Sequence, residues 1–478
     1  MNKKMIFHTL GWVLLIEAIC MILPLICGMI YKEQEVLSFA YTMGLIAIVG
    51  FILIKLPLKS KSLYAKEGLI IVALSWIVMS LAGCIPFIIS GYIPSFTDAL
   101  FETVSGFTTT GASILTDVEA LPKSLLFWRS FTHWIGGMGV LVFLLAILPM
   151  SGANNMHLMR AESPGPSVSK LVPRIRSTAK ILYAIYTAMT ILQMILLIAG
   201  GMPPFESILH AFGTAGTGGF GIKNNSIEGY SPYLQNVITV FMMLFGVNFS
   251  IYYLALTKHF KEIIKSTELK TYLGLFAIAS IFICINILPQ VSGVAEGLRL
   301  SCFQVATVMT TTGYSTCNFD LWPTFSKTIL VFLMFIGASA GSTGGGIKVS
   351  RIIVVIKSIG KELRTLIHPK SVRKITVDGH IVEHETVRGI NVFLAAYACI
   401  FVFSLLIISL DNQSFTTSFT TVVSAINNIG PGLDAVGPAA NFSILSPLSK
   451  YVMIFDMLAG RLEIFPILVL FSSFTYKK

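Results

Sequence analysis

The sequence feature that most restricts the fold is a short stretch that ends in a glycine and occurs four times. Residues Phe107–Ser113 read FTTTGAS, and Val308–Ser315 read VMTTTGYS. Two looser copies, Gly213–Phe220 and Ala425–Pro431, follow the same rule: a helix-like apolar run stops at small or hydroxyl residues and a glycine. The glycines aligned by this rule are Gly111, Gly218, Gly313 and Gly430. Because the copies recur about every hundred residues, the sequence predicts a unit repeated four times around one axis.

Composition indicates the environment of these units. Hydrophobic residues make up 54% of the 478, charged residues only 12%, and the mean hydropathy is +0.79. About a quarter of a soluble domain is charged, so the chain is predicted to be an all-α polytopic membrane protein. A helix needs about 20 apolar residues to cross a bilayer. Ten runs meet this requirement: Met5–Ile30, Leu37–Ile54, Gly68–Tyr92, Leu125–Met150, Ile181–Gly201, Leu234–Leu256, Tyr272–Val291, Thr328–Ile356 with an internal break, Ile390–Leu410 and Leu448–Phe474.

Each repeat also contains an apolar segment that is too short to cross the membrane. These segments are Phe96–Thr108, Pro204–Gly216, Ala295–Met309 and Phe415–Asn428. Ten or so residues of helix cover about 15 Å, half of a bilayer. Irregular backbone at that depth is tolerated where it lines a water-filled path. Each segment is therefore predicted to be a re-entrant pore loop between two spanning helices.

The first two apolar runs have no such segment after them, so they are predicted to form a hairpin outside the repeat. The division that follows is an N-terminal hairpin 1–65, then pore units 66–160, 161–262, 263–372 and 373–478. Three prolines, Pro164, Pro166 and Pro173, prevent a continuous helix between the first and second units and predict a docked cytoplasmic linker there.

Basic residues predict the orientation. Most of the 34 Lys and Arg residues lie near the two termini and in alternate loops. The loops are Lys55–Lys66, Arg160–Lys180, Lys258–Lys270 and Lys348–Arg388. The positive-inside rule places these loops and both termini in the cytoplasm. The net charge of +11 is accordingly a topology signal, and no nucleic-acid partner is expected.

The four stretches have the chemistry of a site for a monovalent cation. A cation that leaves water needs oxygens in place of its hydration shell, and threonine hydroxyls and backbone carbonyls supply them. A glycine allows backbone conformations that a side chain would resist, and helix C-termini that converge on one axis favour positive charge there. No carboxylate lies within the stretches, which argues against a divalent-cation filter.

Other functions were weighed against ion conduction on the same residues. Threonine and glycine also serve close helix packing in membranes, but four copies behind half-length helices favour conduction. A carrier coupled to sodium or protons needs intramembrane acids, for which Asp456 and Glu463 are the candidates. A membrane-embedded enzyme needs a nucleophile, a base and metal ligands together. The sequence shows no such cluster at membrane depth, so no enzymatic activity is expected.

A glycine-rich break, Gly337–Gly346, interrupts the return helix of the third unit. It resembles a nucleotide-binding P-loop only superficially, because Ile347 and Lys348 follow where Lys and then Ser or Thr are required. We predict that the break is a flexible gate beneath the filter, with a simple helix kink as the alternative. The candidate gate residues on this loop are Gly337, Gly341, Gly344, Gly345, Gly346 and Lys348.

Arg461 lies in the middle of the last apolar run, where a charge costs roughly 2.5–3.5 kcal/mol. Its neighbours three and four positions away are apolar, so no acid on its own helix is placed to pair with it. We predict that Arg461 borders the pore below the filter and restrains the gate by its charge. The alternative is a structural ion pair buried between helices.

Other polar residues are assigned structural roles. The loop His380–Glu385 has two histidines and two glutamates but no further ligand spacing, so it is interpreted as a solvated loop rather than a metal site. The seven cysteines form no CxxC pair and are interpreted as core residues. His133, Trp134 and His210 are assigned to packing or to an interface.

The chain also resembles a known family. The residues that carry the resemblance, besides the four stretches, are Trp134–Gly139 (WIGGMG), Arg160–Pro166 (RAESPGP), Ala340–Lys348 (AGSTGGGIK) and Gly460–Glu463 (GRLE). Together they are similar to the Trk/Ktr/HKT superfamily of potassium transporters over essentially the whole chain. The extra N-terminal hairpin favours the TrkH-type pore subunits of bacteria over the KtrB type.

The resemblance implies a four-unit pore in one chain, a homodimer in the bacterial cytoplasmic membrane, an intramembrane gating loop and a pore-facing Arg461. It also implies a cytoplasmic TrkA-type regulatory subunit, which alone would bind nucleotides such as ATP, ADP or NAD(H). Potassium would be the transported ion and the only ligand. By position, the resemblance assigns its coordination to Thr109, Thr110, Gly111, Gly216, Thr217, Gly218, Thr311, Thr312, Gly313, Asn428, Ile429 and Gly430. The fourth stretch, with Asn427–Ile429 in place of threonines, departs most from the pattern.

Overall fold

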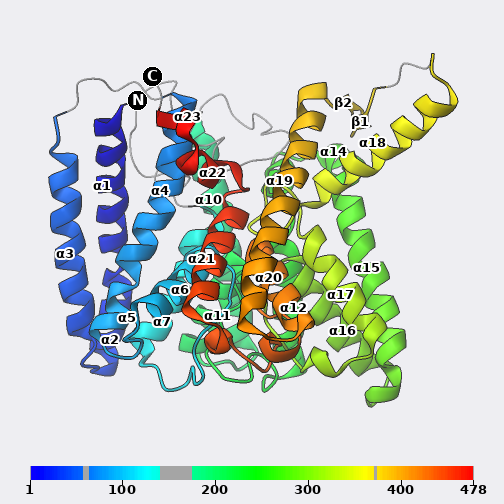
Figure 1. The fold of residues 1–478 in the computed structure, drawn as a ribbon. Coiled ribbons are helices and arrows are strands. Elements are labelled where there is room, and N and C mark those ends of the chain that lie inside the picture. The colour runs from blue at the N-terminus through cyan, green and yellow to red at the C-terminus, as the bar shows by residue number, and fades with distance from the viewer. Residues whose placement is uncertain (1, 58–63, 140–174, 371–373, 477–478) are drawn as a thin grey trace.

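The computed structural model describes residues 2–57, 64–139, 175–370 and 374–476. These residues are mostly helical, as predicted, and many of the helices run side by side along the molecule (Figure 1). Their only strands, β1 (Thr376–Val377) and β2 (His380–Ile381), form a small antiparallel hairpin. The predicted linker, with the motif Arg160–Pro166, lies outside the described residues.

Four groups of helices follow the predicted order of spanning helix, half-length helix and return helix. The first contains α4 (Ala65–Gly83), α5 (Ile85–Ile89), α6 (Phe96–Phe107) and α7 (Lys123–Gly137). The second contains α10 (Ile175–Ala199), α11 (Pro204–Gly216), α12 (Pro232–Phe245), α13 (Phe249–Leu256) and α14 (Phe260–Lys265). The third contains α15 (Thr267–Ile287), α16 (Val294–Met309), α17 (Thr324–Ile336) and α18 (Val349–Ile367). The fourth contains α19 (His384–Ile408), α20 (Phe415–Asn427), α21 (Pro447–Arg461), α22 (Phe465–Phe471) and α23 (Ser473–Tyr476).

The half-length helices α6, α11, α16 and α20 begin and end within one residue of the predicted segments. Their local sequences explain where they begin. Ser95 and Ser414 cap α6 and α20 by accepting the N–H groups of Asp98 and Thr417, and Pro204 occupies the first position of α11. These helices lie in the half of the molecule opposite the N- and C-termini (Figure 1).

The return helices α7, α12, α17 and α21 have only 13 to 15 residues, and α12, α17 and α21 are each followed by a break and a further helix. The break predicted within Thr328–Ile356 is confirmed, but the predictions of unbroken helices over Leu234–Leu256 and Leu448–Phe474 are wrong. Helices α12 and α13 are bent by 89°, and Glu463 and Ile464, with φ of 52° and 71°, end the fourth return helix. Local signals mark both breaks: Gly246 and Asn248 lie between α12 and α13, and Pro466 is the second residue of α22.

Six helices among the described residues are long and apolar enough to cross a membrane, or seven if α12 and α13 count as one span. The breaks account for part of the difference from the predicted ten, because α12, α17 and α21 have only 14, 13 and 15 residues, fewer than a bilayer crossing needs. The number of ten spans therefore stays a prediction.

The N-terminal hairpin consists of α1 (Lys3–Cys20), α2 (Ile22–Tyr31) and α3 (Val36–Ile54). Helices α1 and α3 approach closely where Gly11 meets Gly50, since a Cβ built on Gly11 would lie 2.7 Å from the Gly50 carbonyl oxygen. Helix α1 also packs against α4, and α2 against α7. The hairpin thus flanks the first unit at the edge of the molecule (Figure 1).

Candidate functional site

The four predicted stretches share one backbone conformation. Just after each half-length helix, one residue is left-handed, with φ of 56° at Thr109, 55° at Thr217, 57° at Thr311 and 55° at Asn428. The residue that follows donates its N–H to the carbonyl five positions earlier, at 2.8–3.0 Å, in the pairs Thr110 to Ser105, Gly218 to Gly213, Thr312 to Thr307 and Ile429 to Ser424. This is a Schellman-type helix end, formed four times in the same way.

The shared conformation corrects the register of the second stretch. Two residues after each left-handed residue comes a glycine with positive φ: 77° at Gly111, 74° at Gly219, 90° at Gly313 and 106° at Gly430. The equivalent of Gly111 in the second unit is therefore Gly219, and the sequence alignment on Gly218 is wrong by one residue. The cause is the glycine pair at 218 and 219, because only the backbone conformation distinguishes its two members.

These glycines join the four stretches into a closed ring. A Cβ built on Gly111 would overlap the carbonyl oxygen of Gly218, one on Gly219 that of Thr312, and one on Gly313 that of Ile429. The cycle closes at Gly430, whose Cβ would lie 2.9 Å from the carbonyl oxygen of Thr110. In every case the carbonyl belongs to the residue just before the next glycine of the ring. Positive φ and this close approach together leave room only for glycine.

Side chains support the ring. In the first stretch the hydroxyls of Thr108 and Thr110 lie 2.8 Å apart, and in the third those of Thr310 and Thr312 lie 2.8 Å apart, so the two near-identical sequences make the same contact. In the fourth stretch these two positions are Asn427 and Ile429, and Asn428, at the left-handed position between them, donates its amide nitrogen to the Thr110 hydroxyl at 2.9 Å. Asn428 thus links the last unit of the chain to the first.

A cavity of about 180 Å³ adjoins the glycine end of the ring. Gly111, Gly219, Gly313 and Pro431 line it, one residue from each stretch, together with loops that follow the stretches. The ring therefore opens on this side to a space that all four units share.

The glycine-rich loop 337–346 lies against the ring at its helix end. The N–H of Gly345 donates to the Thr311 hydroxyl at 2.6 Å. A Cβ on Gly345 would overlap the Asn427 carbonyl, and one on Gly344 would lie 2.8 Å from the Thr310 carbonyl oxygen. Larger residues at 344 and 345 would thus push the loop away from the ends of two half-length helices.

The loop is fastened to the break in the second unit. Gly341 accepts the N–H of Phe249 at 3.0 Å, and Ser339 donates to Gly246 at 3.1 Å. Glu268 accepts the N–H of Ala340 at 2.7 Å. At the far end, the buried ammonium of Lys348 donates to the Gly344 carbonyl. The loop therefore has a defined conformation rather than that of a simple kink.

Arg461 connects three units at this level. Its guanidinium donates to the Thr343 carbonyl at 2.7 Å, and to the Gly136 and Gly137 carbonyls at 2.6 and 2.7 Å. Gly136 and Gly137 end helix α7, where the helix dipole favours a positive charge. Arg461 thus contacts the loop 337–346 through Thr343, and its role in restraining a gate stays a prediction. The ion pair formed next to it joins Glu463 to Arg351.

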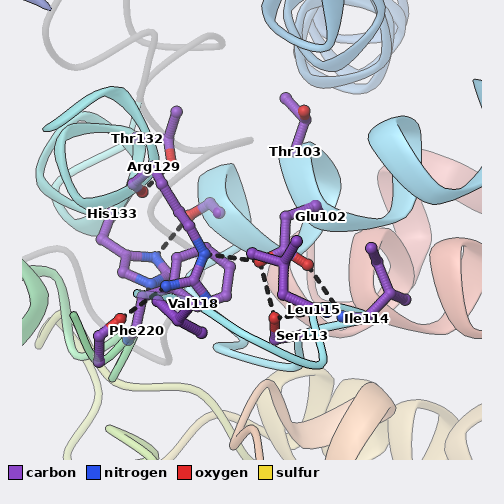
Figure 2. A network of polar contacts seen from close by, with 12 residues as sticks. Glu102, Thr103, Ser113, Ile114, Leu115, Val118, Arg129, Thr132, His133 and Phe220 are labelled. Atoms are coloured by element: carbon purple, nitrogen blue, oxygen red, sulfur yellow. Dashed lines mark hydrogen bonds and ion pairs between the residues drawn. The ribbon is translucent and has the colours of Figure 1, made fainter. Parts of the chain in front are cut away.

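A network of polar contacts lies behind the first two stretches (Figure 2). Glu102 on α6 and Arg129 on α7 form an ion pair at 2.6 Å, and both side chains are almost completely buried. His133 on α7 lies 2.7 Å from the Gly106 carbonyl and accepts the N–H of Phe220 at 3.3 Å. These residues touch the ring's backbone from the protein side.

The comparisons with known proteins agree with this geometry. The model of a cation transport family, TrkH, matches residues 37–476. The chain belongs to the TrkH family. Similar curated relatives are the Trk system potassium uptake protein TrkH of Salmonella typhimurium, 36% identical over 99% of both chains, and the Trk system potassium uptake protein TrkG of Escherichia coli, 32% identical over 100% of this chain and 99% of its own. These relatives are transport proteins rather than enzymes.

The fold of this TrkH-family chain also matches a solved structure. The crystal structure of the potassium transporter TrkH from Vibrio parahaemolyticus superposes with a TM-score of 0.90 over the full length of both chains, at 32% sequence identity. The predicted resemblance to this family and its fold is thereby confirmed.

Sequence reasoning placed the ring and the loop of this TrkH-family chain but overlooked the residues behind the ring. Glu102 and Arg129 received no role, and His133 was assigned to packing. One signal was available, since ionisable residues inside membrane segments usually have a function. Among the described residues, no group of three or more His, Cys, Asp and Glu side chains is placed to hold a metal ion.

Proposed function

We propose that this protein takes up potassium across the bacterial cytoplasmic membrane, and that the ion passes through the ring of four stretches. The observation that carries the proposal is the closed cycle in which each glycine packs against the carbonyl of the next stretch. Curated relatives of this chain carry the name of potassium uptake proteins.

The chemistry of the ring favours a monovalent cation. It offers backbone carbonyls and threonine hydroxyls and contains no carboxylate. Four half-length helices end at the ring, and each C-terminus carries about half a negative charge. The proposed coordinating residues are Thr109, Thr110, Gly111, Gly216, Thr217, Gly218, Thr311, Thr312, Gly313, Asn428, Ile429 and Gly430, with Gly219 added as the partner of Gly111.

The loop 337–346 would be the gate. Its contacts to Thr311 and to the ends of α16 and α20 support this role, because a loop in that position obstructs the way from the ring to the cytoplasmic side. Lys348 would hold the loop shut from within, and Arg461 would hold it from the fourth unit.

Regulation and assembly are part of the proposal. We propose a homodimer, and a TrkA-type cytoplasmic subunit that binds ATP, ADP or NAD(H) and docks on the basic inner face with both termini on the same side. Two features support an assembly. Both termini lie at one end of the molecule (Figure 1). Helix α18 extends from the bundle with Leu363, Leu366 and Ile367 more than half exposed, which suits a protein partner.

A coupled carrier is the second candidate, and one observation favours it. Asp456 is fully buried in α21, where one carboxyl oxygen accepts the Ser404 hydroxyl at 2.8 Å. No hydrogen bond to the other oxygen is seen among the described residues. Such an acid suits proton binding. Coupling would be supported if a proton gradient drives potassium uptake by the wild type but no longer drives it in an Asp456→Asn variant.

The test of the proposed function is cation uptake into liposomes that contain the purified protein, with potassium, rubidium and sodium in turn. Uptake of potassium and rubidium well above that of sodium is expected. Equal uptake of all three ions, or none, would contradict the proposal.

A further inference from the structure

The four half-length helices carry a buried polar side chain at the same position, seven residues before the left-handed residue. These side chains are Glu102, His210, Gln304 and Thr421, each at most 1% exposed. Because the four helices end at one ring in the same conformation, this position faces the back of the ring in each unit. The chemistry differs among the units, and only Glu102 is negatively charged.

Glu102 holds the backbone that leaves the first stretch. One carboxylate oxygen accepts the Ser113 hydroxyl at 3.0 Å, and the other accepts the N–H of Ile114 at 3.0 Å. Both donors lie within three residues of Gly111. The carboxylate therefore sets the position of the chain where it turns away from the ring (Figure 2).

Arg129 carries the same restraint to the second stretch. Its Nε donates to Glu102 at 2.6 Å, while a terminal nitrogen donates to the Gly221 carbonyl at 2.8 Å. The guanidinium also lies 3.5 Å from the centre of the Phe220 ring. Phe220 and Gly221 directly follow Gly219. The ion pair thus bridges two neighbouring stretches of the ring from behind.

His133 fills the remaining space. Since a carbonyl only accepts and an N–H only donates, the hydrogen on this imidazole lies at Nδ1, toward Gly106, and Nε2 accepts from Phe220. A Cβ on Gly218 would overlap the imidazole ring. His133 on α7 therefore contacts both α6 and the second stretch. It leaves no space for the second stretch to move away from the axis of the ring.

We propose that the Glu102–Arg129 ion pair, with His133 beside it, is a positioning device that sets the width of the ring and so determines how well potassium is preferred over sodium. The inference rests on the proposed function. Sodium is the smaller ion, so the oxygens of the ring would have to move inward to coordinate it. The first and second stretches resist that movement because Glu102 and Arg129 bond to the residues that follow them. Binding geometries of this kind have to be held within about 0.5 Å.

A second ion pair on the same helix provides a matched control. Asp98 lies one turn before Glu102 on α6 and pairs with Lys450 of α21 at 2.7 Å. This pair also joins two units, but its carboxylate makes no bond to the backbone that follows Gly111. Neutralising Asp98 therefore removes a negative charge from α6 without removing the restraint on the ring, whereas neutralising Glu102 removes both.

The experiment compares potassium and sodium uptake by the full-length protein in the same liposomes. The ratio of the two uptakes does not depend on how much protein is active, so a merely structural loss leaves it unchanged. We expect Glu102→Gln to lower the ratio roughly tenfold, equivalent to about 1.4 kcal/mol of lost discrimination. Ser113→Ala, which removes one donor and keeps the ion pair, is expected to lower it less. Asp98→Asn is expected to keep the wild-type ratio.

Each outcome decides the inference. A folded Glu102→Gln protein with the wild-type ratio would overturn it, and so would an equal fall in Asp98→Asn. If Glu102→Gln does not fold, two other variants take its place: Ser113→Ala, and the double variant Glu102→Gln/Arg129→Gln, which leaves no unpaired charge. A lowered ratio of potassium to sodium uptake in these variants supports the inference. Wild-type ratios in both variants overturn it. A wild-type protein that does not prefer potassium would overturn the proposed function itself.

Discussion

At the scale of single residues, the ring depends on the absence of side chains. Four glycines combine positive φ with a neighbouring carbonyl at the place where a Cβ would lie. The repeat in the sequence was enough to predict three of them, Gly111, Gly313 and Gly430. It misassigned the fourth, because Gly218 and Gly219 are chemically identical and differ only in backbone conformation.

Gly313→Ala is expected to reduce the preference for potassium over sodium. The new methyl group would overlap the Ile429 carbonyl and displace the fourth stretch, and the residue has φ of 90°. Uptake ratios in liposomes measure the effect. Gly201→Ala is the control, since its φ of 87° imposes the same backbone strain but no atom lies within 4 Å of its Cβ. A wild-type ratio in Gly313→Ala would contradict the role of Gly313 in the filter.

At the scale of helices and loops, the sequence predicted the lengths of the half-length helices but not every break in the return helices. The half-length helices were predicted within a residue, because capping residues and the glycine-ended stretches define both ends. The breaks after α12 and α21 were missed because both runs are apolar overall, although Gly246, Asn248 and Pro466 mark the breaks. A tertiary contact also lies at the end of α21, where Gly460 packs against the carbonyl of Ile426. No local pattern records such a contact.

Arg461→Ala is expected to raise potassium uptake. The guanidinium holds the loop through the Thr343 carbonyl, and a hydrogen bond to a charged group contributes roughly 1.5–3 kcal/mol. Its loss would raise the open fraction about tenfold or more, as long as that fraction is small. Initial rates of uptake measure this change.

Lys357→Ala serves as the control for Arg461→Ala. Lys357 lies on α18, and its replacement also removes one positive charge. Its ammonium, however, bonds to the Thr376 carbonyl at 2.7 Å on the exposed surface. Unchanged uptake and regulation in Arg461→Ala would exclude a gating role for the arginine.

Shortening the loop is expected to raise uptake further. Deletion of Gly341–Thr343 removes the bonds to Phe249 and Arg461 and draws the loop away from Thr311. Uptake rate per folded protein, with folding checked by gel filtration, measures the result. If every deletion within 337–346 leaves the rate unchanged, the loop is a structural element and not a gate.

At the scale of the whole molecule, four units of one chain enclose a site that none of them forms alone. The contacts that close it join residues far apart in sequence, such as Asn428 with Thr110. The fourfold repeat predicted that the units meet at one axis. It could not predict which atoms meet, because the side chains behind the ring differ from unit to unit.

Potassium is expected to stabilise the folded protein, since the ring exists only when all four units are in place. At a hundred times the dissociation constant, one bound ion adds about 2.7 kcal/mol to the free energy of unfolding. Thermal unfolding in detergent, with potassium replaced by choline, measures the effect. The gain should be smaller in Gly313→Ala than in Gly201→Ala, and equal gains would indicate that potassium binds elsewhere.

The most direct test of the central claim is an anomalous diffraction map of crystals grown with rubidium. The account predicts a rubidium peak on the axis of the ring, within coordinating distance of backbone carbonyls from all four stretches. A rubidium peak at another place in the membrane, with none in the ring, would contradict it.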